Sequence, residues 1–206
     1  MTVSAPHDSP RWPEEETPLA RPDWRERLAL AADLALIGFA VTFFALPVLT
    51  APAALATGST AVHHRYRNGR FPDWGPLLRQ YRRAILPGLP VLLAAALLAI
   101  DLTAVRGGWV PGGPLLLTIT TLATLWLSGL ATLTLVTLGR DPALPWRAAA
   151  RWSWDRPRAT AALAATTLFA LFLALAVPVT TPLVIGFHLF AAHVLADRLA
   201  PAPLTL

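Results

Sequence analysis

The sequence contains no cysteine and no lysine, and charged residues make up only 14% of its 206 positions. Without cysteine the chain can form no disulfide, thiolate nucleophile or iron–sulfur cluster. Without lysine it has no Walker lysine, Schiff base or serine–lysine dyad. These absences exclude several classes of enzyme. We expect a protein that is not an enzyme, with no catalytic residue, no cofactor and no bound metal.

Long apolar runs with almost no charge occupy residues 28–199, and 55% of the chain is hydrophobic. A bilayer core of about 30 Å needs about 20 apolar residues in a helix, whereas soluble helices of this length show a polar face. We therefore expect an all-α fold, a polytopic transmembrane helical bundle of about six spans in three hairpins. The predicted spans are residues 28–49, 52–66, 86–105, 115–138, 160–177 and 183–199. The second is marginal, because it is short and rich in small residues.

Arginine is concentrated between the predicted spans, in residues 63–83 and 139–159. Loops rich in arginine remain in the cytoplasm, so both segments and, with six spans, both termini are predicted to be cytoplasmic. We expect a multi-pass protein of the bacterial cytoplasmic membrane, with a flexible tail over residues 1–27 and a short tail over 200–206. The net charge of +5 arises at membrane boundaries, so we expect the lipid bilayer and anionic headgroups as partners, and no nucleic acid.

Each arginine-rich segment also predicts a short interfacial helix, which we call an elbow. In the first elbow the apolar side chains share one helical face and the arginines fall elsewhere, a pattern suited to the headgroup layer or to a partner. Its candidate residues are Trp74, Gly75, Leu77, Leu78, Arg79, Tyr81, Arg82, Arg83, Ile85 and Pro87. A weaker copy over residues 146–154 has the candidates Trp146, Arg147, Arg151, Trp152 and Trp154. Tryptophan favours the membrane interface, which supports both boundaries.

Ionisable side chains inside predicted spans are the remaining candidates for function, because each costs at least ~2.5 kcal/mol at the bilayer centre. Asp33 and Asp101 lie near the ends of their spans, where a charge that snorkels or pairs with arginine is favoured over a functional group. Arg106 is available as a partner for Asp101. His188 lies deeper, and a hydrogen bond to a neighbouring helix is favoured over a role as a proton relay or substrate ligand.

Other polar residues predict packing and local pairing. His193 and Asp197 lie one helical turn apart and are predicted to form an orienting pair. The neighbouring His63 and His64 diverge by about 100° on a helix, so a metal would need further ligands. Residues 115–138 carry a stripe of small hydroxyl side chains that either lines a polar conduit or marks close helix packing, and packing is favoured.

The run Leu46-Pro47-Val48-Leu49-Thr50, followed by Ala51, Pro52 and an alanine-rich helix, resembles the opening signature of the YesL-like bacterial membrane proteins. The first elbow is similar to that family as well, through Phe71, Trp74, Leu77, Tyr81, Arg82, Arg83 and Ala84. The resemblance extends from Trp24 to Leu199, and Ala51 stands where the family typically has glycine. It implies a setting among genes for carbohydrate uptake and glycan degradation, and it implies no particular reaction.

We therefore expect a non-catalytic accessory or scaffold protein that serves carbohydrate uptake, with a membrane transport complex as its candidate partner. The alternative is a transport subunit, either a proton-coupled transporter of small solutes or a permease of an ATP-driven importer. For a permease, Gly75 precedes Ile85 by ten residues and Pro87 follows, a partial match to a coupling helix that lacks the expected Glu-Ala-Ala. A membrane enzyme is least favoured, because the intramembrane ionisable residues are too scattered to converge.

Overall fold

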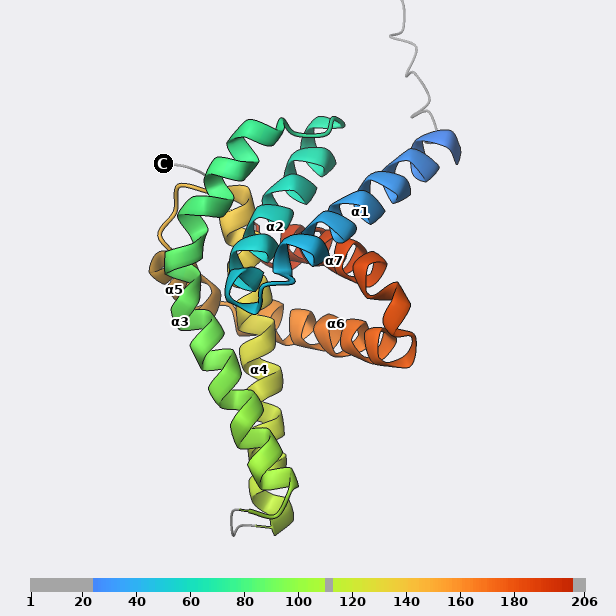
Figure 1. Cartoon of the computed structure of the whole chain (residues 1–206). Coiled ribbons are helices and arrows are strands. Elements are labelled where there is room, and N and C mark those ends of the chain that lie inside the picture. The colour runs from blue at the N-terminus through green and yellow to red at the C-terminus, as the bar shows by residue number, and fades with distance from the viewer. Residues whose placement is uncertain (1–23, 110–112, 202–206) are drawn as a thin grey trace, which may run out of the picture.

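In the computed structural model, residues 24–109 and 113–201 are described, and over these ranges the chain is helical with no strand (Figure 1). The predicted all-α class is confirmed. Residues 1–23 and 202–206 of the predicted tails lie outside these ranges. The elements are α1 (Trp24–Ala45), the 3-10 helix η1 (Val48–Thr50), α2 (Ala51–Asn68), α3 (Trp74–Arg106), α4 (Gly113–Arg140), α5 (Trp146–Trp154), α6 (Pro157–Ala176), η2 (Pro178–Thr180) and α7 (Thr181–Leu199).

Five segments of the described chain are long and apolar enough to cross a membrane: α1, α3, α4, α6 and Pro178–Leu199. α2 is not among them, yet it packs against α1, α3, α4 and α7. Small side chains dominate its buried face, which consists of Pro52, Ala53, Ala54, Ala56, Gly58, Ser59, Ala61 and Val62. A helix surrounded by protein needs no wide apolar face toward lipid. This position explains why the sequence marks the second span as marginal.

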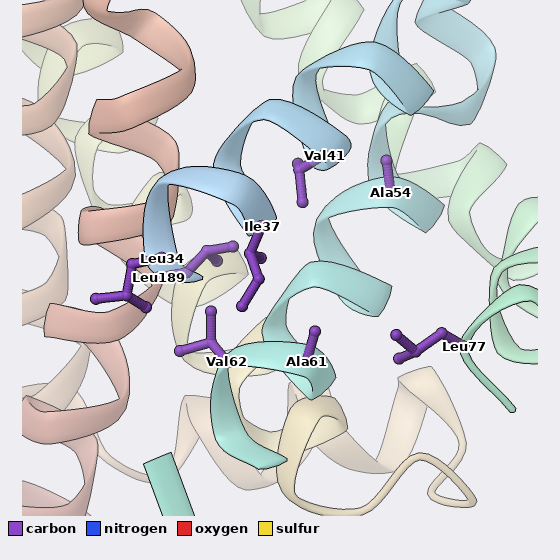
Figure 2. Close-up of a cluster of buried hydrophobic side chains, with 8 residues drawn as sticks. All are labelled: Leu34, Ile37, Val41, Ala54, Ala61, Val62, Leu77 and Leu189. Atoms are coloured by element: carbon purple, nitrogen blue, oxygen red, sulfur yellow. The ribbon is translucent and has the colours of Figure 1, made fainter. Parts of the chain in front are cut away.

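The main apolar core joins four helices around α2. Figure 2 shows side chains of α1 facing those of α2, with Leu77 from α3 on the right and Leu189 from α7 on the left. The cluster consists of Leu34, Ile37, Val41, Ala54, Ala61, Val62, Leu77 and Leu189. A second cluster joins α4, α6 and α7 through residues that include Leu133, Val136, Leu163 and Ala192. Between membrane helices such buried side chains stabilise the fold through close van der Waals packing rather than through removal from water.

Glycines bring helix backbones into direct contact at two crossings. Where α1 crosses α7, a Cβ on Gly38 would overlap the backbone of α7, and one on Gly186 would overlap the carbonyl oxygen of Leu34. Where α4 crosses α6, a Cβ on Gly129 would overlap the carbonyl oxygen of Thr160. Small residues allow this close approach between membrane helices. The first and last helices of the bundle are therefore joined with no side chain between them.

α3 is one continuous helix of 33 residues, and this corrects the sequence prediction. The sequence predicts two elements there, an interfacial elbow ending near Ile85 and a span that begins at residue 86. Pro87 and Pro90 lie inside the helix, although each lacks the N–H that would donate to the preceding turn. The prolines therefore mark no boundary between elements in this structure.

A single buried face explains why α3 is continuous. Leu77, Ala84 and Gly88 are buried and follow helical spacing along its length. Leu77 belongs to the main core with residues of α2. At the other end of this face, a Cβ added to Gly88 would lie 2.9 Å from the Cβ of Pro52. Contact with α2 thus holds α3 from Leu77 as far as Gly88, which lies between the two prolines.

Beyond Gly88, α3 runs alongside α4 as a two-helix hairpin that extends away from the other helices (Figure 1). Only 6% of the most apolar part of α3 is buried. Exposed large side chains of α3 include Leu86, Leu93, Leu97 and Ile100, and those of α4 include Leu115, Ile119 and Leu122. Apolar surface on this scale is unfavourable in water and suits contact with lipid or a partner.

Candidate functional site: a polar cluster between α2, α4 and α7

A buried histidine connects the last helix to the centre of the bundle. His193 on α7 is fully buried, and its Nε2 lies 3.0 Å from both the hydroxyl and the carbonyl oxygen of Ser59 on α2. The Ser59 hydroxyl donates to the carbonyl oxygen of Leu135 on α4 at 2.8 Å. Gly139 allows this approach, because a Cβ there would overlap Ser59. Three helices therefore meet at one serine.

The bonding partners determine where the proton of His193 lies. A carbonyl oxygen only accepts, so Nε2 must carry the hydrogen that bonds to Ser59. The single proton of the Ser59 hydroxyl goes to Leu135, and the hydroxyl oxygen accepts from His193. Nδ1 of His193 has no partner among the described residues. A serine held in this way is not activated as a nucleophile, because no base takes its proton.

His63 lies beside this histidine, one turn of α2 after Ser59. The two imidazole centroids are 5.2 Å apart and their planes are inclined by 35°. Nδ1 of His63 also has no partner in the described part of the chain. Two imidazoles are fewer ligands than a structural metal site uses. Over the described ranges, no group of three or more histidine, cysteine or acidic residues is placed to hold a metal ion.

An ion pair joins α4 to the end of α7. Arg140, the last residue of α4, donates from Nη2 to Oδ1 of Asp197 at 2.6 Å and from Nη1 to the carbonyl oxygen of Ala200 at 3.0 Å. The two charged side chains are only 10% and 24% exposed. The C-terminus of a helix carries partial negative charge and unpaired carbonyls, so a cation is favoured there. Arg140 therefore pairs a carboxylate and caps α7 at once.

α5 is docked beside this cluster. The predicted helix over residues 146–154 is present as α5, and its Ser153 is fully buried and donates to the carbonyl oxygen of Ala149 at 2.9 Å. The guanidinium carbon of Arg156 lies 3.7 Å from the centre of the Trp152 ring, a cation–π contact. Trp152 also packs against the second apolar cluster. The α5 segment is thus attached to α4 and α6 rather than separated from the bundle.

The structure does not bring together the intramembrane residues that the sequence singles out. Asp33 pairs with Arg65 of α2, with 2.5 Å between Oδ2 and Nε. Asp101 is exposed on α3, and it belongs to neither of the two ion pairs within the described residues, so its predicted pairing with Arg106 is absent there. His188 is partly buried on α7. These groups stand on three different helices in three different environments.

The predicted pairing of His193 with Asp197 is wrong. His193 bonds to Ser59 on α2, and Asp197 bonds to Arg140 on α4. The prediction was based on the helical spacing of the two residues within α7, and this spacing contains no information about the other helices. In the packed bundle, residues on neighbouring helices supply the partners instead. α7 is therefore linked to α2 through His193 and to α4 through Asp197.

The candidate elbow residues occupy mixed environments. In the first elbow Tyr81 and Ile85 are partly buried, while the other candidates are exposed, namely Trp74, Gly75, Arg82, Arg83 and Pro87. In the second elbow Trp146 and Trp152 are partly buried, while Arg147, Arg151 and Trp154 are exposed. The exposed arginines and tryptophans remain available to headgroups or a partner.

Sequence reasoning missed Ser59 and Arg140, the two residues that organise the polar cluster. Ser59 lies in a run of small residues, and its separation of four residues from His63 was the available signal for a shared polar face. Arg140 follows a long apolar run directly, so the sequence places it with the loop arginines. Its burial depends on α7 and could not be read from its neighbours.

Comparisons with known protein families, with curated proteins and with solved structures gave no match to this chain. The structure alone therefore defines its class, an all-helical protein with five segments long and apolar enough to cross a membrane. The polar groups between its helices bond mainly to one another or to backbone carbonyls.

Proposed function

We propose that the protein is a non-catalytic integral membrane protein that acts as an accessory or scaffold subunit for other membrane proteins. One observation carries this proposal. Four polar side chains, those of Ser59, Arg140, His193 and Asp197, form hydrogen bonds that link α2, α4 and α7. Large apolar side chains of α3, α4 and α6 are exposed. A scaffold needs both properties, a fixed arrangement of helices and an apolar surface that a membrane partner can cover.

The cellular setting that we propose is the cytoplasmic membrane of a bacterium, in the service of carbohydrate uptake. Its support is the resemblance of residues 46–52 and of the first elbow to the YesL-like proteins. We also propose that both termini and both arginine-rich segments face the cytoplasm. The support for this orientation is the placement of eleven of the seventeen arginines in residues 63–83 and 139–159.

Reporter fusions test the orientation. Fusions at residues 70, 150 and 206 should show cytoplasmic activity, and a fusion at residue 110 should show activity outside. An outside signal at 70 or 150 would overturn the orientation. An outside signal at 206 alone would instead mean that α2 or another helix does not cross.

Substitution and transport measurements test the scaffold role. Asp33→Asn, Asp101→Asn and His188→Gln keep size and hydrogen bonding but remove titration, so each should leave growth on an imported carbohydrate intact. Trp154 on α5 is 61% exposed, and Trp154→Ala should impair growth if this surface meets the partner. The purified protein in sealed vesicles should move no sugar.

Two outcomes would favour the alternative of a transport subunit. Uptake by the isolated protein, abolished by any one of the three titratable substitutions, would establish a secondary transporter. Uptake that appears only with an ATPase partner would support the permease hypothesis. In that case the Gly75 to Pro87 segment would have to act as part of α3 rather than as a separate coupling helix.

A further inference from the structure

The connection between α1 and α2 lies beside the middle of α3. The Tyr81 hydroxyl of α3 donates to the carbonyl oxygen of Phe44, near the end of α1, at 3.2 Å. Seven residues further along α3, a Cβ added to Gly88 would lie 2.9 Å from the Cβ of Pro52, near the start of α2. η1 joins these two ends and contacts α3 as well. The connection is therefore level with the turns of α3 between Tyr81 and Gly88.

From this connection α2 returns along the first half of α3. Nε2 of Gln80 donates to Oγ1 of Thr60 at 2.7 Å. Thr60 lies eight residues after Pro52, and Gln80 lies eight residues before Gly88, so the two helices pack antiparallel over about 12 Å. The α1–α2 hairpin thus ends at the level of Gly88. Beyond it, α3 and α4 continue as a hairpin to a separate tip (Figure 1).

The part of α3 beyond Gly88 has the length of one bilayer crossing. From Gly88 to Arg106 the helix advances by about 27 Å, against a hydrocarbon core of about 30 Å. Large apolar side chains such as Leu93 are exposed along it, and its one ionisable residue, Asp101, lies within about 8 Å of Arg106 along the axis. Trp109 follows at the tip and is 79% exposed, as an interfacial residue would be. Residues 88–106 therefore match the hydrocarbon layer.

The first half of α3 does not match that layer. Arg79, Arg82 and Arg83 follow helical spacing on one face, are exposed, and belong to neither ion pair within the described residues. If the α1–α2 hairpin crossed the bilayer, hydrocarbon would surround this half of α3 and these arginines, at a high cost. The apolar half would then extend into water. The hydrocarbon is better placed around residues 88–106, which leaves the connection between α1 and α2 at one face.

That connection carries an apolar surface to the boundary of the hydrocarbon. Leu46, Val48 and Leu49 are each at least 65% exposed. The backbone N–H of Thr50 donates to the carbonyl oxygen of Pro47 at 2.7 Å, so the turn bonds part of its own backbone. A turn at membrane depth needs such bonds, because hydrocarbon supplies none. An uncharged, apolar tip suits the acyl chains of the nearer leaflet.

We propose that the α1–α2 hairpin is re-entrant: it enters the bilayer from one face, turns at η1 in the nearer leaflet and leaves by the same face. The surface at the turn, formed by Leu46, Val48 and Leu49, meets the acyl chains of that leaflet only. The α3–α4 hairpin crosses the bilayer beside it. Because two of the predicted crossings are removed together, both termini keep a common side. Neither the scaffold role nor the choice of the cytoplasmic face enters this geometry.

Cysteine labelling in sealed membranes tests the proposal, because the chain has no cysteine of its own. A membrane-impermeant maleimide is applied to the full-length protein in intact spheroplasts and in inverted vesicles. Asn68→Cys at the end of α2 and Trp109→Cys at the hairpin tip mark the two faces. Leu49→Cys should react from the same face as Asn68→Cys, and Val48→Cys replaces it if that variant does not fold. Reaction from the face of Trp109→Cys, or from neither face before detergent is added, would overturn the proposal.

A disulfide between α2 and α3 tests the level of the hairpin in the membrane. Thr60→Cys with Gln80→Cys should cross-link on oxidation, because the two side chains are in contact. Thr60→Cys with Leu93→Cys is the control and should not, since Leu93 lies about 20 Å further along α3. A linked control pair or an unlinked test pair would overturn the proposal. If Asn68→Cys reacts from outside the cell, the orientation proposed above is wrong, while a shared face for Leu49→Cys and Asn68→Cys still supports the re-entrant hairpin.

Discussion

At the scale of single residues, the interior of the bundle depends on backbone acceptors as much as on side chains. His193 donates to a carbonyl oxygen as well as to a hydroxyl, and Arg140 reaches both a carboxylate and a carbonyl. A side-chain substitution does not remove a backbone carbonyl. His193 and Arg140 therefore each keep one acceptor when the side chain of their other partner is changed. Their energetic roles can be separated by choosing which partner is changed.

The first prediction compares Ser59 with His193. Ser59→Ala should cost about 1 kcal/mol of unfolding free energy, because the carbonyl of residue 59 still accepts from Nε2. His193→Ala should cost about 3 kcal/mol, because it also leaves a cavity among three helices. Unfolding in mixed detergent micelles measures both, and Ser128→Ala, whose hydroxyl bonds only within α4, serves as the control. Equal losses of unfolding free energy in Ser59→Ala and His193→Ala would contradict this prediction, because they would mean that the Ser59 hydroxyl alone holds the histidine.

The second prediction concerns the pair of Arg140 and Asp197. Arg140→Gln or Asp197→Asn alone should cost about 2–4 kcal/mol, because each leaves a mostly buried charge without its partner. The double variant should cost little more than either single variant. The same micelle titration gives all three values. Additive losses would contradict a direct interaction between the two side chains.

At the scale of helices, small residues decide which elements touch. Gly186 on α7 meets the backbone of α1, whereas a Cβ on Gly75 at the start of α3 would meet nothing within 4 Å. The same substitution should therefore have opposite effects at these two positions, since alanine is the better helix former where space is available.

The third prediction follows from that contrast. Gly186→Ala should separate α1 from α7 and cost about 2 kcal/mol or more, a typical cost of overpacking. Gly75→Ala should be neutral or should stabilise α3 by up to about 1 kcal/mol. Thermal unfolding in detergent compares the two variants. A loss of stability in Gly75→Ala, or none in Gly186→Ala, would contradict the glycine crossing.

The helices themselves are predictable from the sequence, and their partners are not. Long apolar runs define α1, α4, α6 and α7 because lipid imposes the same demand on every residue of a span. The continuity of α3 depends on α2, which holds Leu77 and Gly88 on one face. The bond from His193 to Ser59 depends on a residue 134 positions away. Local periodicity contains neither piece of information.

At the scale of the whole molecule, the length of α3 exceeds what one bilayer crossing requires. Its 33 residues extend about 50 Å, against a hydrocarbon core of about 30 Å. Part of the helix must therefore leave the hydrocarbon or tilt strongly. The arginines at positions 79, 82 and 83 are exposed, which places the first turns at the aqueous boundary.

The fourth prediction tests that placement, and the absence of native cysteine makes it direct. Single cysteines at Arg79, Leu93 and Ile100 all lie at exposed positions of α3. In membrane vesicles a water-soluble maleimide should label Arg79→Cys and should leave Leu93→Cys and Ile100→Cys unlabelled. All three should react after denaturation in detergent. Labelling at Leu93→Cys in intact vesicles would show that this part of α3 does not face lipid.

The contact between α1 and α7 has a consequence for how the chain is made. α1 leaves the ribosome first and α7 last, yet they meet backbone to backbone, and α7 also supplies the partner of Ser59. Until α7 is made, Ser59 of α2 therefore lacks its histidine partner, although its hydroxyl can already donate to Leu135 of α4. The bundle closes only once α7 has been synthesised. A chain that stops before α7 leaves Gly38 of α1 and Ser59 of α2 without the partners that close the bundle.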